Sequence, residues 1–185
     1  MTAAAALTFR DEPRAADLAR VREIVEATGF FSGEELAVAI ELLDDRLAKG
    51  PASDYRFLFG EADGRVAGYS AYGRIALTRG SWDLYWIAVD PAAQGSGVGR
   101  ALLHESERRI ARAGGERVYV ETSSRAQYDP TRRFYERCGY HVAATLPDFY
   151  APGDGKVIFV KRVGVYTDAS GSGTSGRPGP SAPPP

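Results

Sequence analysis

Cysteine and histidine are scarce in this 185-residue chain, which contains one cysteine, Cys138, and two histidines, His104 and His141. A single cysteine excludes a disulfide within the chain and a zinc site built from several thiolates. Two histidines add little material for a catalytic metal. We therefore expect no metal ion at the functional site.

An excess of one charge and a long apolar run are also missing. Lys and Arg total 23 and Asp and Glu total 24, which gives a net charge of −1. This balance provides neither a positive field for nucleic acid nor a polybasic membrane anchor. Apolar runs stay short of the ~18 residues that span a membrane, and the first residues lack the features of a signal peptide. The sequence predicts a cytoplasmic protein that binds neither nucleic acid nor membrane.

What is present is the composition of a globular domain, with 44% hydrophobic and 25% charged residues. The length suits one domain with a sizeable core, which we expect at 1–167. The tail at 168–185 reads DASGSGTSGRPGPSAPPP. It has no apolar side chain other than Ala and Pro, so the sequence predicts that this tail is disordered.

Hydrophobic periodicity predicts alternating strands and helices. Ser32 and Glu35 have the spacing of a capping box at a helix start, and residues 81–89 are apolar on both faces, as is typical of a central strand. The predicted strands are 7–10, 55–60, 65–75, 81–89, 117–122, 139–147 and 156–162, and the predicted helices are 13–28, 32–49, 98–113 and 131–138. The order β-αα-βββ-α-β-α-ββ predicts an α/β or α+β domain with a mixed sheet of about six to seven strands.

A glycine-rich segment, DPAAQGSGVGR at 90–100, follows the central strand and opens a helix. Helix N-termini carry unpaired N–H groups and a partial positive charge, and glycines let the backbone approach an anion such as pyrophosphate. Glycines at 95, 97 and 99 do not match the dinucleotide spacing G-x-G-x-x-G, and the Gly-Lys-Ser/Thr of a P-loop is absent. A structural turn without a ligand is the alternative.

The pattern Gln94-x-x-Gly97-x-Gly99, between WIAVDP and RALL, resembles the acyl-CoA signature of the GNAT superfamily of N-acyltransferases. A second segment, FYERCGY at 134–140, resembles that family's Y-x-x-x-G-F/Y element. The resemblance covers roughly residues 7–163. It implies the GNAT fold and transfer of an acyl group from acetyl-CoA, or another short acyl-CoA, to a primary amine.

The same resemblance implies where CoA binds. In the family, the loop amides bind the CoA pyrophosphate, and the strand before the loop bonds the pantetheine and polarises the thioester carbonyl. The implied cofactor-binding residues are Ile87, Ala88, Val89, Gln94, Gly95, Ser96, Gly97, Val98, Gly99 and Arg100. Arg132 and Arg133 are further candidates for the CoA phosphates, with a solvated helix start as the equal alternative.

Transfer to an amine needs a base for the ammonium, stabilisation of the oxyanion and a proton donor for the thiolate. No Ser-His-Asp or Cys-His arrangement is evident, so we expect direct transfer without a covalent enzyme intermediate. The resemblance implies Tyr135 as the proton donor, with a packing role as its alternative. Glu121 is the leading general base, with Asp83, Tyr85 or a water chain as rivals and a solvated glutamate as the alternative.

The acceptor site is expected along the strand 69–73 and the loop 147–155, which together favour a small amine or an amino acid. The acidic residues of the second helix are a minor candidate for attracting a cationic acceptor. The alternative acceptors are a protein N-terminus and a lysine side chain. A non-catalytic acyl-CoA sensor is the alternative from another class, and glycine spacing disfavours a nucleotide-binding domain. A homodimer is left open.

Overall fold

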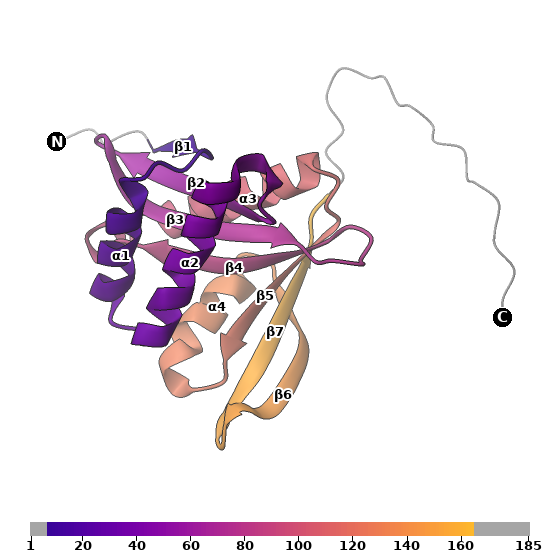
Figure 1. Cartoon of the computed structure of the whole chain (residues 1–185). Coiled ribbons are helices and arrows are strands. Elements are labelled where there is room, and N and C mark those ends of the chain that lie inside the picture. Colours follow the sequence, from indigo (N-terminus) through magenta and orange to yellow (C-terminus); the bar gives the residue numbers. More distant parts are fainter. Residues whose placement is uncertain (1–6, 165–185) are drawn as a thin grey trace, which may run out of the picture.

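A seven-stranded mixed sheet forms the centre of the structure, a computed structural model that describes residues 7–164. The strands lie in the order β1-β2-β3-β4-β5-β7-β6 (Figure 1). They are β1 (Thr8–Arg10), β2 (Tyr55–Ala62), β3 (Arg65–Arg74), β4 (Ser81–Val89), β5 (Arg117–Ser123), β6 (His141–Ala151) and β7 (Asp154–Arg162). All neighbours pair antiparallel except β4 and β5, which are parallel. The predicted mixed sheet is confirmed, whereas the tail at 168–185 lies outside the described residues.

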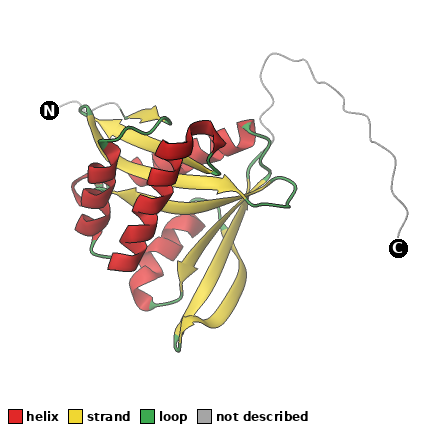
Figure 2. Ribbon diagram, in the orientation of Figure 1, coloured by secondary structure: helices red, strands yellow, loops and turns green. Residues whose placement is uncertain are grey.

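Helices cover both faces of the sheet, as Figure 2 shows. On one face lie α1 (Asp17–Thr28) and α2 (Gly33–Lys49), and on the other lie α3 (Val98–Arg112) and α4 (Asp129–Arg137). Short 3-10 turns are η1 (Gly50–Ala52), η2 (Pro91–Ala93) and η3 (Ala126–Tyr128). Each face has its own apolar core, and the element order matches the prediction.

Strand β3 contributes to both cores. Tyr69 and Ala71 pack under α1 and α2, while Ala67 and Tyr72 pack under α3. The expectation that residues 69–73 line an acceptor site is therefore wrong. The strand lies between β2 and β4 with helices on both faces, so its aromatic side chains are buried.

The start of α2 is the predicted capping box. Ser32 Oγ accepts a hydrogen bond from the Glu35 N–H at 3.2 Å, and the Ser32 N–H donates to the Glu35 carboxylate at 2.7 Å. Two N–H groups at the helix start are thereby satisfied. This fixes where the loop between α1 and α2 ends.

Two boundaries differ from the prediction by more than two residues. Helix α1 begins at Asp17 rather than at residue 13, because the Asp17 carboxylate binds the Arg14 N–H at 2.7 Å and the Arg10 guanidinium at 2.9 Å. The predicted loop 147–155 is mostly strand, since β6 extends to Ala151 and pairs there with Asp154. The pairing of β6 with β7 shifts register between Leu146 and Ala151, and this irregularity accommodates the turn-forming residues between them.

Within residues 7–164, none of the helices combines the length and the apolar character that crossing a membrane requires.

Candidate active site

Strands β4 and β5 pair over only three residues and then separate. The last parallel pair joins Asp83 to Tyr119. Beyond it, residues 84–89 of β4 and 120–123 of β5 line a cavity of about 1100 Å³. Because β4 no longer pairs with β5 there, its backbone groups on this edge are available to a ligand.

A β-bulge in β4 lies at the point of separation. Ala71 and Tyr72 are consecutive on β3, and their partners on β4 are Trp86 and Leu84 respectively, so Tyr85 is the extra residue. A bulge bends and twists its strand. The extra residue also reverses the alternation of side chains along β4. Leu84 packs on the side of α3, whereas Trp86, two residues later, packs towards α1 and α2. The bulge thus helps β4 to diverge from β5.

The loop after β4 depends on two glycines. Gly95 and Gly97 have φ angles of 77° and 91°, in the left-handed region that residues with a Cβ disfavour. Gly97 is the N-cap of α3, whose first turn leaves N–H groups without a partner inside the helix. Both glycines and Gly99 line the cavity. The N-terminus of a 15-residue helix therefore borders the cavity and offers an anion site.

The base of this loop is fixed by Asp90. Its carboxylate accepts a hydrogen bond from the Ala92 N–H at 2.9 Å and forms an ion pair with Arg20 of α1. The hydrogen bond from Arg20 is the main cause that lowers the pKa of Asp90. Arg20 also donates to the carbonyl of Val66 at 2.9 Å. The loop is thereby tied to α1 and β3.

Two arginines line the cavity beside the loop, Arg100 on α3 and Arg137 on α4. Arg132 instead donates to the carbonyls of Ser123 and Arg125, so it holds the segment between β5 and α4 in place. Arg133 does not line the cavity. The sequence prediction therefore overlooked Arg137, whose position within FYERCGY was the only available signal.

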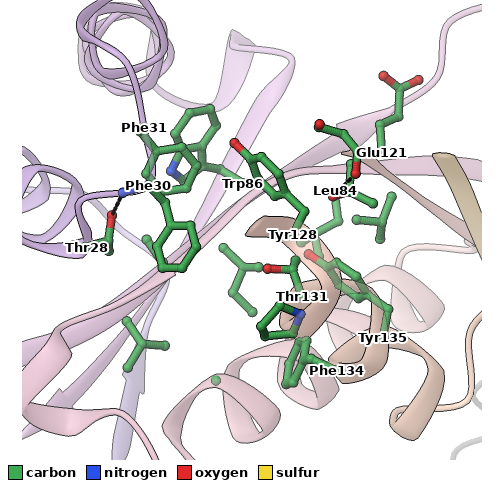
Figure 3. A pocket seen from close by; sticks show the side chains of 18 of the residues that line it. Thr28, Phe30, Phe31, Leu84, Trp86, Glu121, Tyr128, Thr131, Phe134 and Tyr135 are labelled. Atoms are coloured by element: carbon green, nitrogen blue, oxygen red, sulfur yellow. Dashed lines mark hydrogen bonds between the residues drawn. The ribbon is translucent and has the colours of Figure 1, made fainter. Parts of the chain in front are cut away.

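Tyr135 of α4 is buried at the floor of the cavity and is 4% exposed. Its ring lies 5.3 Å from that of Phe134, 5.6 Å from Tyr140 and 5.9 Å from Phe159. In Figure 3 its hydroxyl points into the pocket. Burial raises the pKa of Tyr135, so the phenol is protonated near neutral pH and able to donate. Packing was expected mainly of Phe134, but Tyr135 is the more deeply buried of the two.

Three candidate bases lie on the face of the sheet opposite to Tyr135. Glu121 lines the cavity, and its Oε2 lies 2.5 Å from Lys156 Nζ. Asp83 is half-buried and does not line the cavity; burial, with a smaller contribution from Glu121, raises its pKa to about 6. Burial raises the pKa of Tyr85 to about 12, so this phenol does not accept a proton at neutral pH. Of the three, Glu121 is the one that has a carboxylate and also lines the cavity.

The far end of the cavity is aromatic. Phe30 and Phe31 come from the loop between α1 and α2, Trp86 from β4 and Tyr128 from η3 (Figure 3). The rings of Phe31 and Trp86 lie 4.7 Å apart, and those of Phe30 and Tyr128 lie 6.4 Å apart. Tyr150 of β6 lines the same end. The sequence pointed to Trp86 through its strand and to Tyr150 through its predicted loop. It gave no sign of Phe30, Phe31 or Tyr128, because the segments that carry them are far apart in the chain.

A model of the acetyltransferase (GNAT) domain matches residues 53–142, which contain the open strand pair, the loop and all of α4. A solved structure of a GNAT-family protein from Desulfovibrio desulfuricans is 46% identical, with a TM-score of 0.84, and the alignment covers 86% of this chain and all of that one. The chain belongs to the GNAT family of acetyltransferases. As a GNAT acetyltransferase domain it is an acyltransferase domain, and membership of this family implies acetyl-CoA as its cosubstrate.

Relatives of known sequence agree with this family. An uncharacterized N-acetyltransferase of Methanocaldococcus jannaschii is 31% identical over 57% of this chain and 65% of its own length, so the match leaves about a third of that relative uncovered. The blasticidin-S acetyltransferase of Streptomyces morookaense is 33% identical over 52% of this chain and 68% of its own length. Both relatives are named as acetyltransferases.

Most of the residues predicted to bind acetyl-CoA surround the cavity of this GNAT domain. The lining residues among them are Ile87, Ala88, Val89, Gln94, Gly95, Gly97, Gly99 and Arg100. Val98 instead packs in the core beneath α3, and the Ser96 hydroxyl donates to the Ala93 carbonyl at 2.6 Å. Neither side chain lines the cavity, so only their backbone N–H groups are left to contact a phosphate. Residues 7–164 contain no group of three His, Cys, Asp or Glu side chains that could hold a metal.

Proposed function

We propose that this protein transfers an acetyl group from acetyl-CoA directly to the primary amine of a small molecule. The observation that carries the proposal is one cavity bounded by two features: the unpaired edge of β4 and the N-terminus of α3. The first suits an extended amide chain such as pantetheine, and the second suits a pyrophosphate. A cavity of about 1100 Å³ has room for the thioester and for an acceptor beside it.

Within this proposal, the N–H groups at 95–100 bind the pyrophosphate, and the end of β4 at 87–89 binds the pantetheine. Arg100 and Arg137 supply positive charge for the phosphates. The thioester carbonyl then lies near the β4 bulge, where a backbone N–H polarises it. Arg137 is added to the residues that the sequence predicted.

Tyr135 is proposed as the acid. Its hydroxyl faces the pocket, and burial keeps the phenol protonated. Donation to the departing thiolate restores the thiol of CoA, while the amine nitrogen bonds to the acetyl carbon and the C–S bond breaks. The deeply buried ring would give the hydroxyl a fixed position.

Glu121 is proposed as the base, with Asp83 as its rival. Glu121 lines the cavity and Asp83 does not, which favours Glu121. In Figure 3 the Glu121 carboxylate is directed away from the Tyr135 hydroxyl, so a bridging water is the simplest route for the proton of the ammonium. A water chain alone is the remaining alternative.

A small-molecule acceptor is favoured over a protein. Support comes from the aromatic, concave far end of the cavity and from the relative that is named for acetylation of blasticidin S. The test is release of CoA from acetyl-CoA in the presence of a panel of amines, with product mass as the second readout. Release only with peptides would favour the protein alternative, and binding without release would favour an acyl-CoA sensor.

Assembly, location and domain limits complete the proposal. Strand β6 ends the sheet and all eleven of its residues are exposed, which supports a homodimer formed through this edge. Light scattering on the full chain tests the dimer.

The domain is proposed at 1–167, before the tail at 168–185, and a cytoplasmic location stays a prediction from the sequence.

A further inference from the structure

Large apolar side chains at the surface gather around the far end of the cavity. Phe30, Tyr85 and Tyr150 are 42%, 38% and 49% exposed, and all three line the cavity. Phe149 is half-exposed beside Tyr150, with ring centroids 5.0 Å apart. Exposed aromatic side chains that converge on one cavity are typical of a ligand site, because isolated surface residues would be scattered instead.

The rings are arranged for contact with a flat group. Phe31 and Trp86 lie 4.7 Å apart with an interplanar angle of 31°, and they form one wall. Phe30 and Tyr128 lie 6.4 Å apart at 55°. A ring held between two others needs about 3.5 Å on each side. The 6.4 Å between the centroids of Phe30 and Tyr128 is therefore too short for these two rings to enclose a ligand ring. A planar ligand would instead stack against the open face of one ring and meet the edge of another.

The same end carries negative charge. Glu34 and Glu35 at the start of α2 line it, as do Glu121 and Asp154. Glu35 and Glu121 both contribute to the raised pKa of Tyr150, after burial as the main cause, so the carboxylates lie around the aromatic group. Two cations lie on this side: Arg125 is ion-paired with Asp154 at 3.0 Å and Lys156 with Glu121 at 2.5 Å, which leaves Glu34 and Glu35 as the further negative charges. An ammonium is the charge that this arrangement attracts.

We propose that the acceptor is a primary ammonium joined by a short chain to a planar aromatic or heteroaromatic ring. The inference rests on the proposed function, because the ammonium must reach the thioester while the ring stays at the aromatic end. Glu121 takes one proton of the ammonium, and the neutral amine forms the C–N bond as the C–S bond breaks. Tyr135 protonates the thiolate, and the second proton lost by the nitrogen passes through water to restore the phenol. Polycationic sugars are disfavoured because they have no planar ring to stack on the aromatic side chains at this end.

The test compares two amines of equal length and similar shape, 2-phenylethylamine and 2-cyclohexylethylamine. Both are hydrophobic, and only the first has a π system. We expect kcat/KM for CoA release to be about 3- to 10-fold higher for the phenyl compound, the range that aromatic pairs contribute beyond their buried area. Kanamycin and an alanyl tetrapeptide complete the panel and are expected to be poorer acceptors.

Replacement of Phe30 by Leu tests the Phe30–Tyr128 ring pair, because it removes a ring but keeps an apolar side chain. The preference for phenyl over cyclohexyl should fall to less than twofold, with KM for acetyl-CoA unchanged. Tyr128→Leu removes the neighbouring ring from a different segment and should act in the same direction. Val142→Ala changes an exposed apolar residue of β6 that does not line the cavity, so it should leave the preference intact.

The outcomes separate the two proposals. Equal kcat/KM for the two amines, or a preference for the tetrapeptide or kanamycin, overturns this inference and leaves acetyl transfer standing. A preference that both ring variants retain also overturns it. No CoA release with any amine overturns both proposals, and a rise in Tm with acetyl-CoA would then identify an acyl-CoA sensor.

Discussion

Glu121 Oε2 lies 2.5 Å from Lys156 Nζ, so the proposed base is ion-paired in the absence of an acceptor. The same ammonium lies 3.9 Å from the centre of the Phe149 ring. An incoming substrate ammonium therefore competes with Lys156 for one carboxylate. This pair makes the pH dependence of the reaction a sensitive test of the base.

Glu121→Gln should lower kcat/KM by ~10²-fold near neutral pH, which is the scale of general-base catalysis. The loss should shrink at high pH, where the acceptor amine is already neutral. Initial rates of CoA release between pH 6.5 and 10 measure it. A normal rate at pH 7 would transfer the role to Asp83 or to water.

Lys156→Met removes the positive charge beside both carboxylates. Lys156 opposes the rise in the pKa of Asp83, so its loss should raise that pKa further. If Asp83 is the base, the acidic limb of the kcat/KM profile should move to higher pH. A limb that stays in place would exclude Asp83 as the base. Acetyl-CoA affinity serves as the control and should be unchanged.

Asp83→Asn should stabilise the protein at neutral pH. The pKa of Asp83 is raised to about 6 from its ordinary value of 3.8, mainly by burial. The folded state therefore binds more protons than the unfolded state between these values, and stability is lost as pH rises through that window. The substitution should raise Tm by about a few degrees at pH 7.5, with little gain at pH 4. Activity within threefold of the parent would leave Glu121 as the base.

The sequence predicted those parts of the fold and site that depend on local pattern. The start of α2 at Ser32 follows from capping chemistry with Glu35. The turn at Gly95 and Gly97 follows from backbone angles that glycine tolerates. The burial of strand 69–73 was missed, because alternation does not reveal that helices cover both faces. Contacts between distant segments, such as that of Phe30 with Tyr128, have no local signal at all.

Gly97→Glu should abolish the rise in Tm that acetyl-CoA produces. A Cβ added at this position has no atom within 4 Å apart from its chain neighbours, so a carboxylate has room to extend into the place proposed for the pyrophosphate. The φ angle of 91° adds backbone strain. Gly97→Asn is the matched control, because Asn tolerates left-handed angles and carries no charge. Equal acetyl-CoA affinity in folded Gly97→Glu protein would contradict the loop assignment.

Tyr135→Phe removes one hydroxyl and keeps the ring that packs against Phe134 and Phe159. A thiol of ordinary pKa, about 8.5, leaves tolerably as a thiolate, so protonation accelerates the reaction without being obligatory. We expect kcat to fall by ~10- to 10³-fold, with acetyl-CoA affinity and Tm nearly unchanged.

Tyr140→Phe is the control for Tyr135, because Tyr140 is also buried, its ring lies 5.6 Å from that of Tyr135, and it does not line the cavity. Removal of this second hydroxyl should leave kcat within about twofold. Burial raises the pKa of both phenols, so neither loses its proton across the assay range. A difference in kcat between the two variants therefore reports where each hydroxyl lies relative to the thioester. Full kcat in Tyr135→Phe, measured where chemistry limits the rate, would leave that residue a core aromatic and assign protonation of the thiolate to solvent.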